Sequence, residues 1–482
     1  MILKSFYEER LAQASFLLGS PASGEALVID PNRDVDRYID AARAEGLRIT
    51  AVTETHVHAD FVSGSRELAQ RVGATLAVSA EGGPDWQYAF AGDPGVRLLH
   101  DGDSLRAGGV RLTVRHTPGH TPEHLTFLLT DEGTSPEPVG AFTGDFIFSG
   151  DVGRPDLMER AAGVAGTMDA AARQLFRSLQ RFRSLPERLL LWPGHGAGSA
   201  CGKKLGGMPV TALGYEKLAN WAFQIESEDE FVEKVLEDQP EPPRYFAEMK
   251  RVNKIGAEAA RIEPAHLEPE ALGAAVAREI QVVDLRPLAE FAQGFVPGTI
   301  SIPLDKSFLN WCGALLDSRQ EICLIGEEGQ IREASAALAL IGLDHVTGWF
   351  SPRVLDYWRG HYGGLAGIAH IAASQLLELQ RQGHVIVDVR NASEYRAGHI
   401  PGALHIPLGR IPESAASLSR DSNVIVHCQG GARSPIALSV LRKMGFHDVA
   451  NFAGGFADYR RQGLPVEDGV APESVQPALG RG

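Results

Sequence analysis

The sequence has no long hydrophobic run and few cysteines. No apolar stretch reaches the ~18 residues that a membrane helix needs, and charged residues occupy positions 1–10, where a signal peptide needs an apolar segment. The four cysteines (Cys201, Cys312, Cys323 and Cys428) are too few and too scattered for a disulfide framework or a zinc knuckle. These absences predict a cytoplasmic protein that does not enter a membrane.

The sequence also has no conspicuous basic run. It contains 46 Lys and Arg against 61 Asp and Glu, a formal net charge of −15, which argues against nucleic acid and anionic membranes as partners. The hydrophobic fraction of 44% and the charged fraction of 22% are typical of globular proteins. A length of 482 residues predicts about three domains.

Metal-binding side chains follow several predicted strands of the N-terminal half. The apolar segment 49–52 precedes a loop in which His56, His58 and Asp60 fall within five positions. Further apolar strands precede loops that hold His120, Asp145 and His195. Imidazole and carboxylate groups are the ligands that first-row metals prefer. Four such loops in one domain predict a metal site formed at the ends of strands.

Residues 1 to about 235 alternate apolar strands with amphipathic helices, the latter near 34–45, 63–72 and 168–182. Together with the order of the metal-binding residues, this pattern predicts two sheets between layers of helices, with the metal at one rim. Proline-rich segments at 237–243 and 262–269 predict linkers around a further helix.

The motifs T-H-V-H-A-D (55–60), T-P-G-H-T (117–121), T-G-D (143–145) and G-D-V-G-R-P-D (150–156) resemble those of persulfide dioxygenases, which have the metallo-β-lactamase fold. The resemblance implies one Fe(II) per chain, held by His56, His120 and Asp145. It places His58, Asp60 and His195 behind these ligands. Phe61 stands where two-zinc hydrolases of this fold have a final histidine, which argues against a second metal. Two histidines and one carboxylate suit Fe(II) with O2.

The chain repeats itself between about 265 and 465. The run Asp284-Leu-Arg286 matches Asp388-Val-Arg390, and Glu394 and a downstream Pro-Gly pair also have counterparts. This pattern resembles the rhodanese domain, which implies two α/β domains, each with a parallel sheet wrapped by helices. We interpret Asp388, Arg390 and Glu394 as structural ion-pairing residues. The expected domains are 1–250, 251–365 and 366–468, with a flexible tail at 469–482.

In the second repeat, a buried strand ends at Cys428 and a helix begins near Pro435. Glycines let the loop curl so that backbone N–H groups point inward, and the helix N-terminus adds positive potential. This setting predicts a thiolate or persulfide on Cys428, with a pKa below the free value of ~8.5. Arg433 is predicted to hold an anion such as thiosulfate or sulfite. The loop residues expected to bind substrate are Gln429, Gly430, Gly431 and Ala432.

The first repeat has Gly326 where the nucleophile should be, followed by two glutamates that repel anions. We therefore predict a rhodanese-like domain without a nucleophile, with a structural or docking role. Cys312 and Cys323 lie outside its loop and are interpreted as apolar core residues.

Arg154 and Cys201 can each be interpreted as structural or as functional residues. Arg154 either pairs with Asp156 at the rim of the site or binds a substrate anion. Cys201 is either an inert loop thiol or a second persulfide carrier near the iron. Lys203 and Lys204 favour a thiolate there, and hence the functional role.

The resemblance covers nearly the whole chain and implies oxidation of a low-molecular-weight persulfide by O2 to sulfite, coupled to sulfur transfer through Cys428 that makes or uses thiosulfate. The thiol carrier is expected to be of the glutathione, coenzyme A or bacillithiol type, and the protein to form a homo-oligomer. One alternative is a glyoxalase-II-like zinc thioester hydrolase with an accessory rhodanese. Another is a non-catalytic sulfur carrier, against which the complete ligand set argues.

Overall fold

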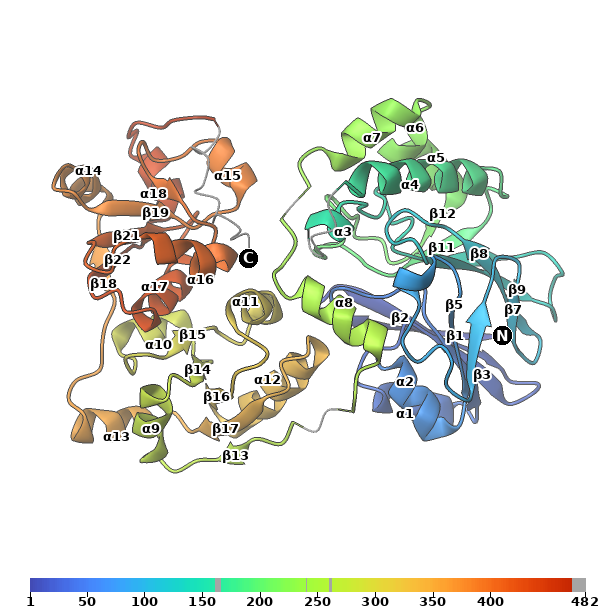
Figure 1. Cartoon of the computed structure of the whole chain (residues 1–482), viewed down its shortest axis with the longest axis horizontal. Coiled ribbons are helices and arrows are strands. Elements are labelled where there is room, and N and C mark those ends of the chain that lie inside the picture. The colour runs from blue at the N-terminus through green and yellow to red at the C-terminus, as the bar shows by residue number, and fades with distance from the viewer. Residues whose placement is uncertain (161–165, 240, 260–261, 470–482) are drawn as a thin grey trace. The chain divides into compact units, whose positions relative to one another are not determined.

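The computed structural model describes residues 1–160, 166–239, 241–259 and 262–469 (Figure 1). The chain divides into two compact units, one made mainly of residues 1–261 and the other mainly of residues 262–482. Nearly all of the tail expected at 469–482 lies outside the described residues. Among the described residues, no helix is both long and apolar enough to cross a membrane.

The first unit contains two six-stranded sheets. One has the order β1-β2-β3-β4-β5-β6, formed by Ile2–Glu8, Gln13–Ser20, Glu25–Ile29, Arg48–Thr53, Thr75–Ser79 and Val96–Leu99. The other has the order β12-β11-β10-β9-β8-β7, whose strands from β7 to β12 are Ser104–Ala107, Val110–His116, Leu125–Asp131, Gly140–Gly144, Leu190–Pro193 and Thr211–Ala212. The first sheet is antiparallel from β1 to β3 and parallel from β3 to β6. In the second sheet β10–β11 is parallel and the other pairs are antiparallel.

The two sheets pack face to face, and helices cover their outer faces. The helices of this unit are α1 (Asp36–Ala44), α2 (Ser65–Val72), α3 (Leu157–Arg160), α4 (Met168–Arg183), α5 (Leu213–Ala219), α6 (Trp221–Gln224), α7 (Glu228–Leu236) and α8 (Phe246–Ile255), with a 3-10 turn at Pro84–Trp86. Inward side chains of both sheets, such as Phe16 and Phe142, form the central core. The predicted αββα sandwich is therefore confirmed for this unit.

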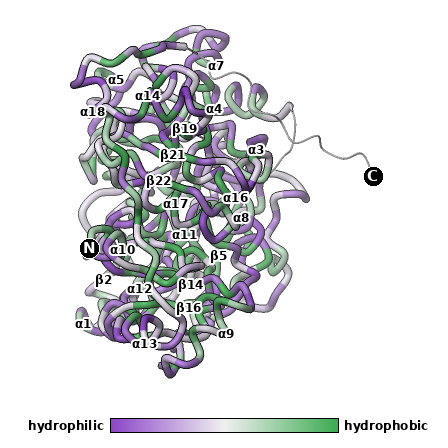
Figure 2. The backbone as a smooth tube through the Cα atoms, turned by 90° about the vertical axis from the view of Figure 1, so that its left-hand side faces the viewer, coloured by the Kyte–Doolittle hydropathy of each residue, from purple (hydrophilic) through white to green (hydrophobic). Residues whose placement is uncertain are grey.

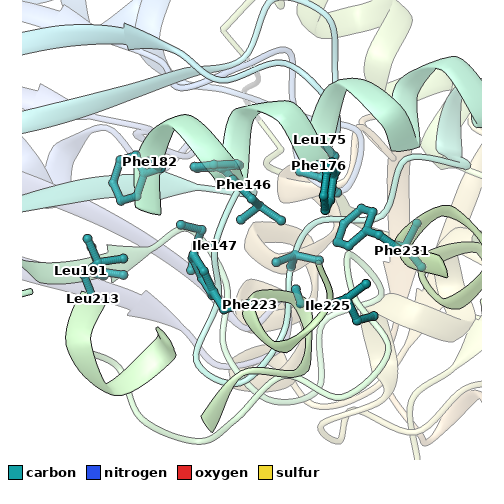
Figure 3. Packing of buried hydrophobic residues seen from close by; sticks show 14 of the residues in the cluster. Phe146, Ile147, Leu175, Phe176, Phe182, Leu191, Leu213, Phe223, Ile225 and Phe231 are labelled. Atoms are coloured by element: carbon teal, nitrogen blue, oxygen red, sulfur yellow. The ribbon is translucent and has the colours of Figure 1, made fainter. Parts of the chain in front are cut away.

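The outer layers have cores of their own. Tyr38 and Leu68 seal α1 and α2 against the first sheet. In Figure 3, aromatic residues from α4, α7 and the loops meet over the second sheet, with 5.4 Å between the ring centroids of Phe176 and Phe231. Each buried Phe of this kind stabilises the fold by about 1.5–3 kcal/mol. These layers hold the strand ends, and the loops that follow them, in fixed positions.

The second unit contains two five-stranded sheets in which every strand pair is parallel. The first has the order β13-β17-β16-β14-β15, whose strands from β13 to β17 are Ala265–His266, Gln281–Asp284, Ile300–Ser301, Ile322–Ile325 and Val346–Phe350. The second has the order β18-β22-β21-β19-β20, whose strands from β18 to β22 are Ala369–Ile371, Val385–Asp388, Leu404–His405, Val424–His427 and Val449–Phe452. The two orders correspond strand for strand, as the sequence repeat predicts.

Helices wrap both of these sheets. The first repeat has α9 (Ala271–Ala277), α10 (Leu288–Gln293), α11 (Phe308–Leu315), α12 (Glu328–Leu340) and α13 (Val354–His361). The second has α14 (Ala373–Arg381), α15 (Ala392–Arg396), α16 (Ile411–Ser414), α17 (Ser434–Lys443) and α18 (Gly455–Arg461), with 3-10 turns at Leu408–Arg410 and Ala415–Ser417. Central strands such as β16 and β21 are almost wholly apolar and appear as hydrophobic stretches of the trace in Figure 2. Strands covered on both faces have this composition.

Candidate metal centre and cysteine loop

Three side chains from different loops meet at one rim of the sandwich. His56 follows β4, His120 lies between β8 and β9, and Asp145 follows β10. Their ligand atoms lie within 4.8 Å of one another. The Nε2 atoms of His56 and His120 are 3.8 and 3.5 Å from Asp145 Oδ2. The structure thus brings together the three residues proposed as ligands from the sequence.

Hydrogen bonds determine which atom of each ring faces this centre. Thr55 Oγ1 lies 2.9 Å from His56 Nδ1, and the carbonyl oxygen of Arg154 accepts from His120 Nδ1 at 3.1 Å. Both rings therefore present Nε2 to the centre. Burial lowers the pKa of both imidazoles, and neighbouring imidazoles lower that of His56 further. Both rings are consequently neutral, which is the form that binds a metal.

The two carboxylate oxygens of Asp145 have different surroundings. Oδ1 accepts from His195 Nδ1 at 2.7 Å, whereas the buried Oδ2 has no hydrogen-bond partner. Burial raises the pKa of Asp145, but His195 and His120 lower it more, so the net pKa is below its usual range. A buried, unpaired carboxylate oxygen is costly unless a cation satisfies it. Two neutral imidazoles and this oxygen fit a divalent first-row metal.

Asp60, His195 and Cys201 form a second group that is connected to the first through His195. Their nearest ligand atoms also lie within 4.8 Å of one another, and His195 Nε2 is 2.6 Å from Asp60 Oδ2. The other oxygen of Asp60, Oδ1, is buried without a hydrogen-bond partner. Oxygen, nitrogen and sulfur donors therefore lie next to the three residues proposed as ligands.

The electrostatic setting of Cys201 contradicts the expected thiolate. Burial raises the pKa of its thiol well above the ordinary value, and the carboxylates of Asp60 and Asp145 raise it further. The ammonium group of Lys203 donates to a backbone carbonyl of α7 at 2.8 Å. Lys203 and Lys204 follow Cys201 closely in sequence, but this closeness does not direct their side chains toward the thiol, so it is not evidence for a thiolate.

Asp30 is a residue of this site that the sequence analysis did not single out. It follows β3 with a φ of 50°, an uncommon conformation for a residue with a side chain. Its carboxylate accepts from the backbone N–H and the hydroxyl of Thr55 at 2.7 and 2.9 Å and lies 3.2 Å from His58 Nε2. Burial lowers the pKa of His58, but Asp30 raises it more, to about 9. The Phe61 ring lies 4.4 Å from the His58 ring.

Arg154 is fully buried rather than at the rim. Its guanidinium donates to both oxygens of Asp156 at 2.9 and 2.8 Å and to the carbonyl of Ala200 at 3.0 Å, while its own carbonyl orients His120. This position gives Arg154 a structural role and does not support the expected contact with a substrate anion.

Two further buried residues connect the metal loops. His124 Nε2 accepts from the backbone N–H of Asp145 at 3.1 Å, and Glu123 accepts from the backbone N–H of Val57 at 2.8 Å. Burial raises the pKa of Glu123 to about 7. Their only sequence signal is their place shortly after His120, which by itself does not distinguish them from core residues.

Helix α8 holds the first metal loop in place through Asn253. The Asn253 amide donates to the carbonyls of His58 and Phe61 at 2.8 and 2.7 Å, and its carbonyl accepts from the N–H of Ser63 at 2.8 Å. Asn253 is buried, so these three hydrogen bonds satisfy loop backbone groups that water would otherwise have to bind. This helix extends past the expected end of the domain at residue 250, and all of it packs as part of the first unit.

Asn253→Ala leaves three buried backbone groups without partners, each costing about 1–3 kcal/mol. We expect a lower melting temperature and an affinity for divalent metal reduced about 10- to 100-fold, the usual effect of removing a group that orients a metal loop. Chelator competition measures the affinity and circular dichroism the melting. Arg251→Ala, an exposed change on the same helix, is the control. Unchanged affinity in the Asn253 variant would show that α8 does not position the loop.

The second candidate site is the loop between β21 and α17. Cys428 is its first residue, and its Sγ accepts from the N–H of Gly431 at 3.1 Å and lies 3.6 Å from Ser434 Oγ. Burial raises the pKa of the thiol, but hydrogen bonds from Ser434 and from the N–H groups of Arg433 and Gly431 lower it more. The net pKa is below the ordinary value, in agreement with the sequence prediction. The side chains of Gln429 and Ala432 are exposed.

Arg433 is already paired within the protein. Its Nη1 and Nη2 donate to Glu394 Oε2 and Oε1 at 2.6 and 2.7 Å. Arg390 pairs with Asp388 as interpreted from the sequence, and it also donates to Gln429 at 3.1 Å. The sequence predicted that Arg433 binds an external anion, whereas in the structure its guanidinium is hydrogen-bonded to Glu394.

The corresponding loop of the first repeat is almost absent. Asp284 pairs with Ile325 at the end of β16, just as Asp388 pairs with His427 at the end of β21. Gly326 therefore takes the place of the nucleophile. Only Gly326 and one further residue separate β16 from α12. The sequence predicted a loop whose two glutamates repel anions, but in the structure the second of these glutamates, Glu328, already begins α12.

Comparison with known proteins identifies both parts of the chain. Residues 9–195 match the metallo-beta-lactamase superfamily, and residues 372–462 match the rhodanese-like domain. A crystal structure of a metallo-beta-lactamase from Staphylococcus aureus subsp. aureus COL is 41% identical with a TM-score of 0.66, covering 73% of this chain and 99% of that chain.

Two curated relatives carry different activities. The mitochondrial persulfide dioxygenase ETHE1 of Bos taurus is 31% identical over 200 residues, which are 40% of this chain and 68% of that protein. The hydroxyacylglutathione hydrolase of Methylococcus capsulatus is 30% identical over 185 residues, 37% of this chain and 60% of that protein. The chain belongs to the metallo-beta-lactamase superfamily and carries a C-terminal rhodanese-like domain.

Proposed function

We propose that the protein oxidises low-molecular-weight persulfides with O2 and transfers sulfur through Cys428. The observation that carries this proposal is the presence, in one chain, of a buried group of two histidines and one carboxylate together with a cysteine loop that stabilises a sulfur anion. Fe(II), one per chain, would be held by His56, His120 and Asp145 and would supply the activation of O2 for oxidation of the persulfide sulfur. The similarity to a persulfide dioxygenase supports this assignment.

The proposed oxidation is RSSH + O2 + H2O → RSH + SO3²⁻ + 2 H⁺, in which the terminal sulfur is oxidised and O2 is reduced. Asp145 and His195 fix each other through the Nδ1–Oδ1 hydrogen bond. Burial lowers the pKa of His195, but Asp145 and Asp60 raise it well above its ordinary value. His195 therefore holds a proton at Nε2 beside the site where thiol and sulfite are released.

The proposed transfer has two half-reactions at Cys428. Its thiolate attacks the outer sulfur of a persulfide, an Sγ–S bond forms, the RS–S bond breaks, and the leaving thiolate takes the proton of the persulfide. Sulfite then attacks the outer sulfur of the enzyme persulfide, releasing thiosulfate and the Cys428 thiolate. The reverse direction is allowed. The covalent connection of the two activities places an acceptor for sulfite on the same chain that forms it.

The proposal extends to the substrate carrier and the middle domain. Persulfides of the glutathione, coenzyme A or bacillithiol type are the candidate substrates. The domain expected at 251–365 is proposed to be rhodanese-like and without a nucleophile. Its strand order repeats that of the following domain, and Gly326 stands at the cysteine position. Its role would be structural or in docking.

The second candidate is a zinc thioester hydrolase. The similarity to a hydroxyacylglutathione hydrolase and the donor group of Asp60, His195 and Cys201 favour it. Phe61 is the main objection, because it places a buried apolar ring at the position of a ligand.

Metal analysis of anaerobically purified protein, joined to O2 uptake on addition of glutathione persulfide, separates these candidates. About one iron per chain, with O2 consumed and sulfite or thiosulfate formed, is the result expected for the dioxygenase. Two zinc ions per chain, no O2 uptake and cleavage of a glutathione thioester would transfer the assignment to the hydrolase.

The shifted pKa values predict that Cys428 is the most reactive thiol of the chain. At pH 7 its alkylation by iodoacetamide should be at least ~10-fold faster than that of the other cysteines, because burial raises the pKa values of Cys201, Cys312 and Cys323. Its rate should rise with pH and level off at a lower pH than the rates of the other cysteines, because hydrogen bonds to Sγ lower its pKa. Mass spectrometry of peptides from the native protein measures all four sites. Equal rates would contradict the proposed stabilisation of the thiolate.

A further inference from the structure

The cysteine loop, residues 428–433, contains a single cationic residue, Arg433, and this residue is ion-paired with the carboxylate of Glu394. Arg433 and Glu394 form a two-point ion pair at 2.6 and 2.7 Å, with 18% and 30% of the two side chains exposed. Glu394 lies in the first turn of α15, where its Oε2 also accepts from the N–H of Asn391 at 3.0 Å. Glu394 is thus held in position by its own helix rather than drawn in by Arg433 alone.

The reacting species of the two half-reactions at Cys428 carry different total negative charges. A Cys428 thiolate with a neutral persulfide carries one negative charge, or two if the persulfide is ionised. A Cys428 persulfide with sulfite carries three, as does the thiolate with thiosulfate. Thiosulfate use and sulfite use share one transition state, since each is the reverse of the other. A fixed carboxylate near the loop therefore opposes this half-reaction more than persulfide uptake.

We propose that Glu394, acting through Arg433, sets the balance between the two half-reactions and favours sulfur uptake from persulfides over exchange with thiosulfate and sulfite. The inference rests on the proposed function and narrows the sulfur donor of the same loop to a species of low charge. Glu394 is a positioning residue in this scheme, because it withholds the guanidinium from anions without contacting the substrate. The remaining groups at the sulfur, the Gly431 N–H and the Ser434 hydroxyl, are neutral and serve both half-reactions.

The test uses the full chain and the variant Glu394→Gln, which keeps the shape and the contact with Asn391 but removes the charge. Rapid quenching and mass spectrometry measure the loading of Cys428 from thiosulfate and from glutathione persulfide, and its discharge to sulfite. Loading from thiosulfate and discharge to sulfite should each rise about 10-fold, and loading from persulfide should stay within about twofold. Glu290→Gln, the matching change in the repeat without a nucleophile, should change none of these rates.

The double variant Glu394→Gln, Arg433→Gln distinguishes the release of the guanidinium from a merely structural effect of losing the ion pair. It should return the thiosulfate rate to near the wild-type value, because both proteins lack an available cation. Salt dependence of the wild type gives an independent measurement if a variant does not fold. The rate of loading from thiosulfate should change less than about twofold between about 50 and 500 mM salt, since the guanidinium of Arg433 is neutralised by Glu394.

Three results would overturn the inference: equal changes for both donors in Glu394→Gln, a further rise in the double variant, or a steep fall of the wild-type thiosulfate rate with salt. Wild-type protein that loads Cys428 from neither donor would instead refute the sulfur-transfer function itself. The two failures are therefore distinguishable in one set of measurements.

Discussion

Cys428→Ala is expected to abolish sulfur transfer and to leave O2 consumption with persulfide unchanged. The loss should be on the order of 10³-fold or more, as for removal of a covalent nucleophile. No other group can replace it in the loop, because its neighbours Gln429, Gly431 and Ser434 have no thiol and the first repeat has glycine at the corresponding position. Sulfite should then accumulate in place of thiosulfate. Ion chromatography of the products, alongside an O2 electrode, measures both activities.

Cys323→Ala is the matched control, because Cys323 lies on β16, the strand that corresponds to β21, but in the core. It should keep normal transfer. Full transfer activity in Cys428→Ala would assign the nucleophile to another thiol. Cys201 would be the first candidate, since it is the one that lies beside the metal ligands.

Asp145→Asn is expected to remove the metal and with it the O2 consumption. The amide oxygen can still accept from His195 Nδ1, so the amide NH2 would take the place of Oδ2, 3.5 Å from His120 Nε2. A neutral donor at that position cannot bind a cation. Metal affinity should fall by at least ~100-fold, the upper end of the effect of changing a group behind the ligands, and persulfide oxidation should fall with it.

Elemental analysis of metal per chain and O2 uptake check this second result. His100→Asn changes an exposed histidine of the same unit and should alter neither value. Sulfur transfer at Cys428 should persist in Asp145→Asn, because its groups belong to the other compact unit. A full complement of metal in Asp145→Asn would exclude Asp145 as a ligand.

The sequence predicted those features that depend on local spacing. The sequence predicted that His56 and Asp145 follow apolar strands and lie at a metal site, and the structure places them after β4 and β10 with their ligand atoms close together. Their choice as ligands was implied by the resemblance to persulfide dioxygenases. The match of Asp284 with Asp388 predicted two sheets of the same topology, and the structure has them. Glycines around Cys428 predicted inward N–H groups, and Gly431 donates to the sulfur.

Features that depend on long-range packing could not be predicted in this way. Asp30 lies at least 25 residues, and Asn253 at least 190 residues, from the loop atoms that they bind, and no spacing rule connects them. Arg433 was given to an external anion because Glu394 lies 39 residues away in sequence and was interpreted within its own motif. For Cys201, burial and two carboxylates outweigh the lysines that follow it.

The near-absence of a loop after β16 limits how the first repeat can be engineered. A cysteine placed at Gly326 would begin with its Cβ 3.2 Å from Leu285 Cδ1 and, because α12 starts so soon, without a ring of amides to hold a sulfur anion. What separates the two repeats is the length of a backbone segment rather than one side chain. A single codon change at Gly326 would therefore not reproduce the cysteine loop of the second repeat, because the segment between β16 and α12 would also have to be lengthened.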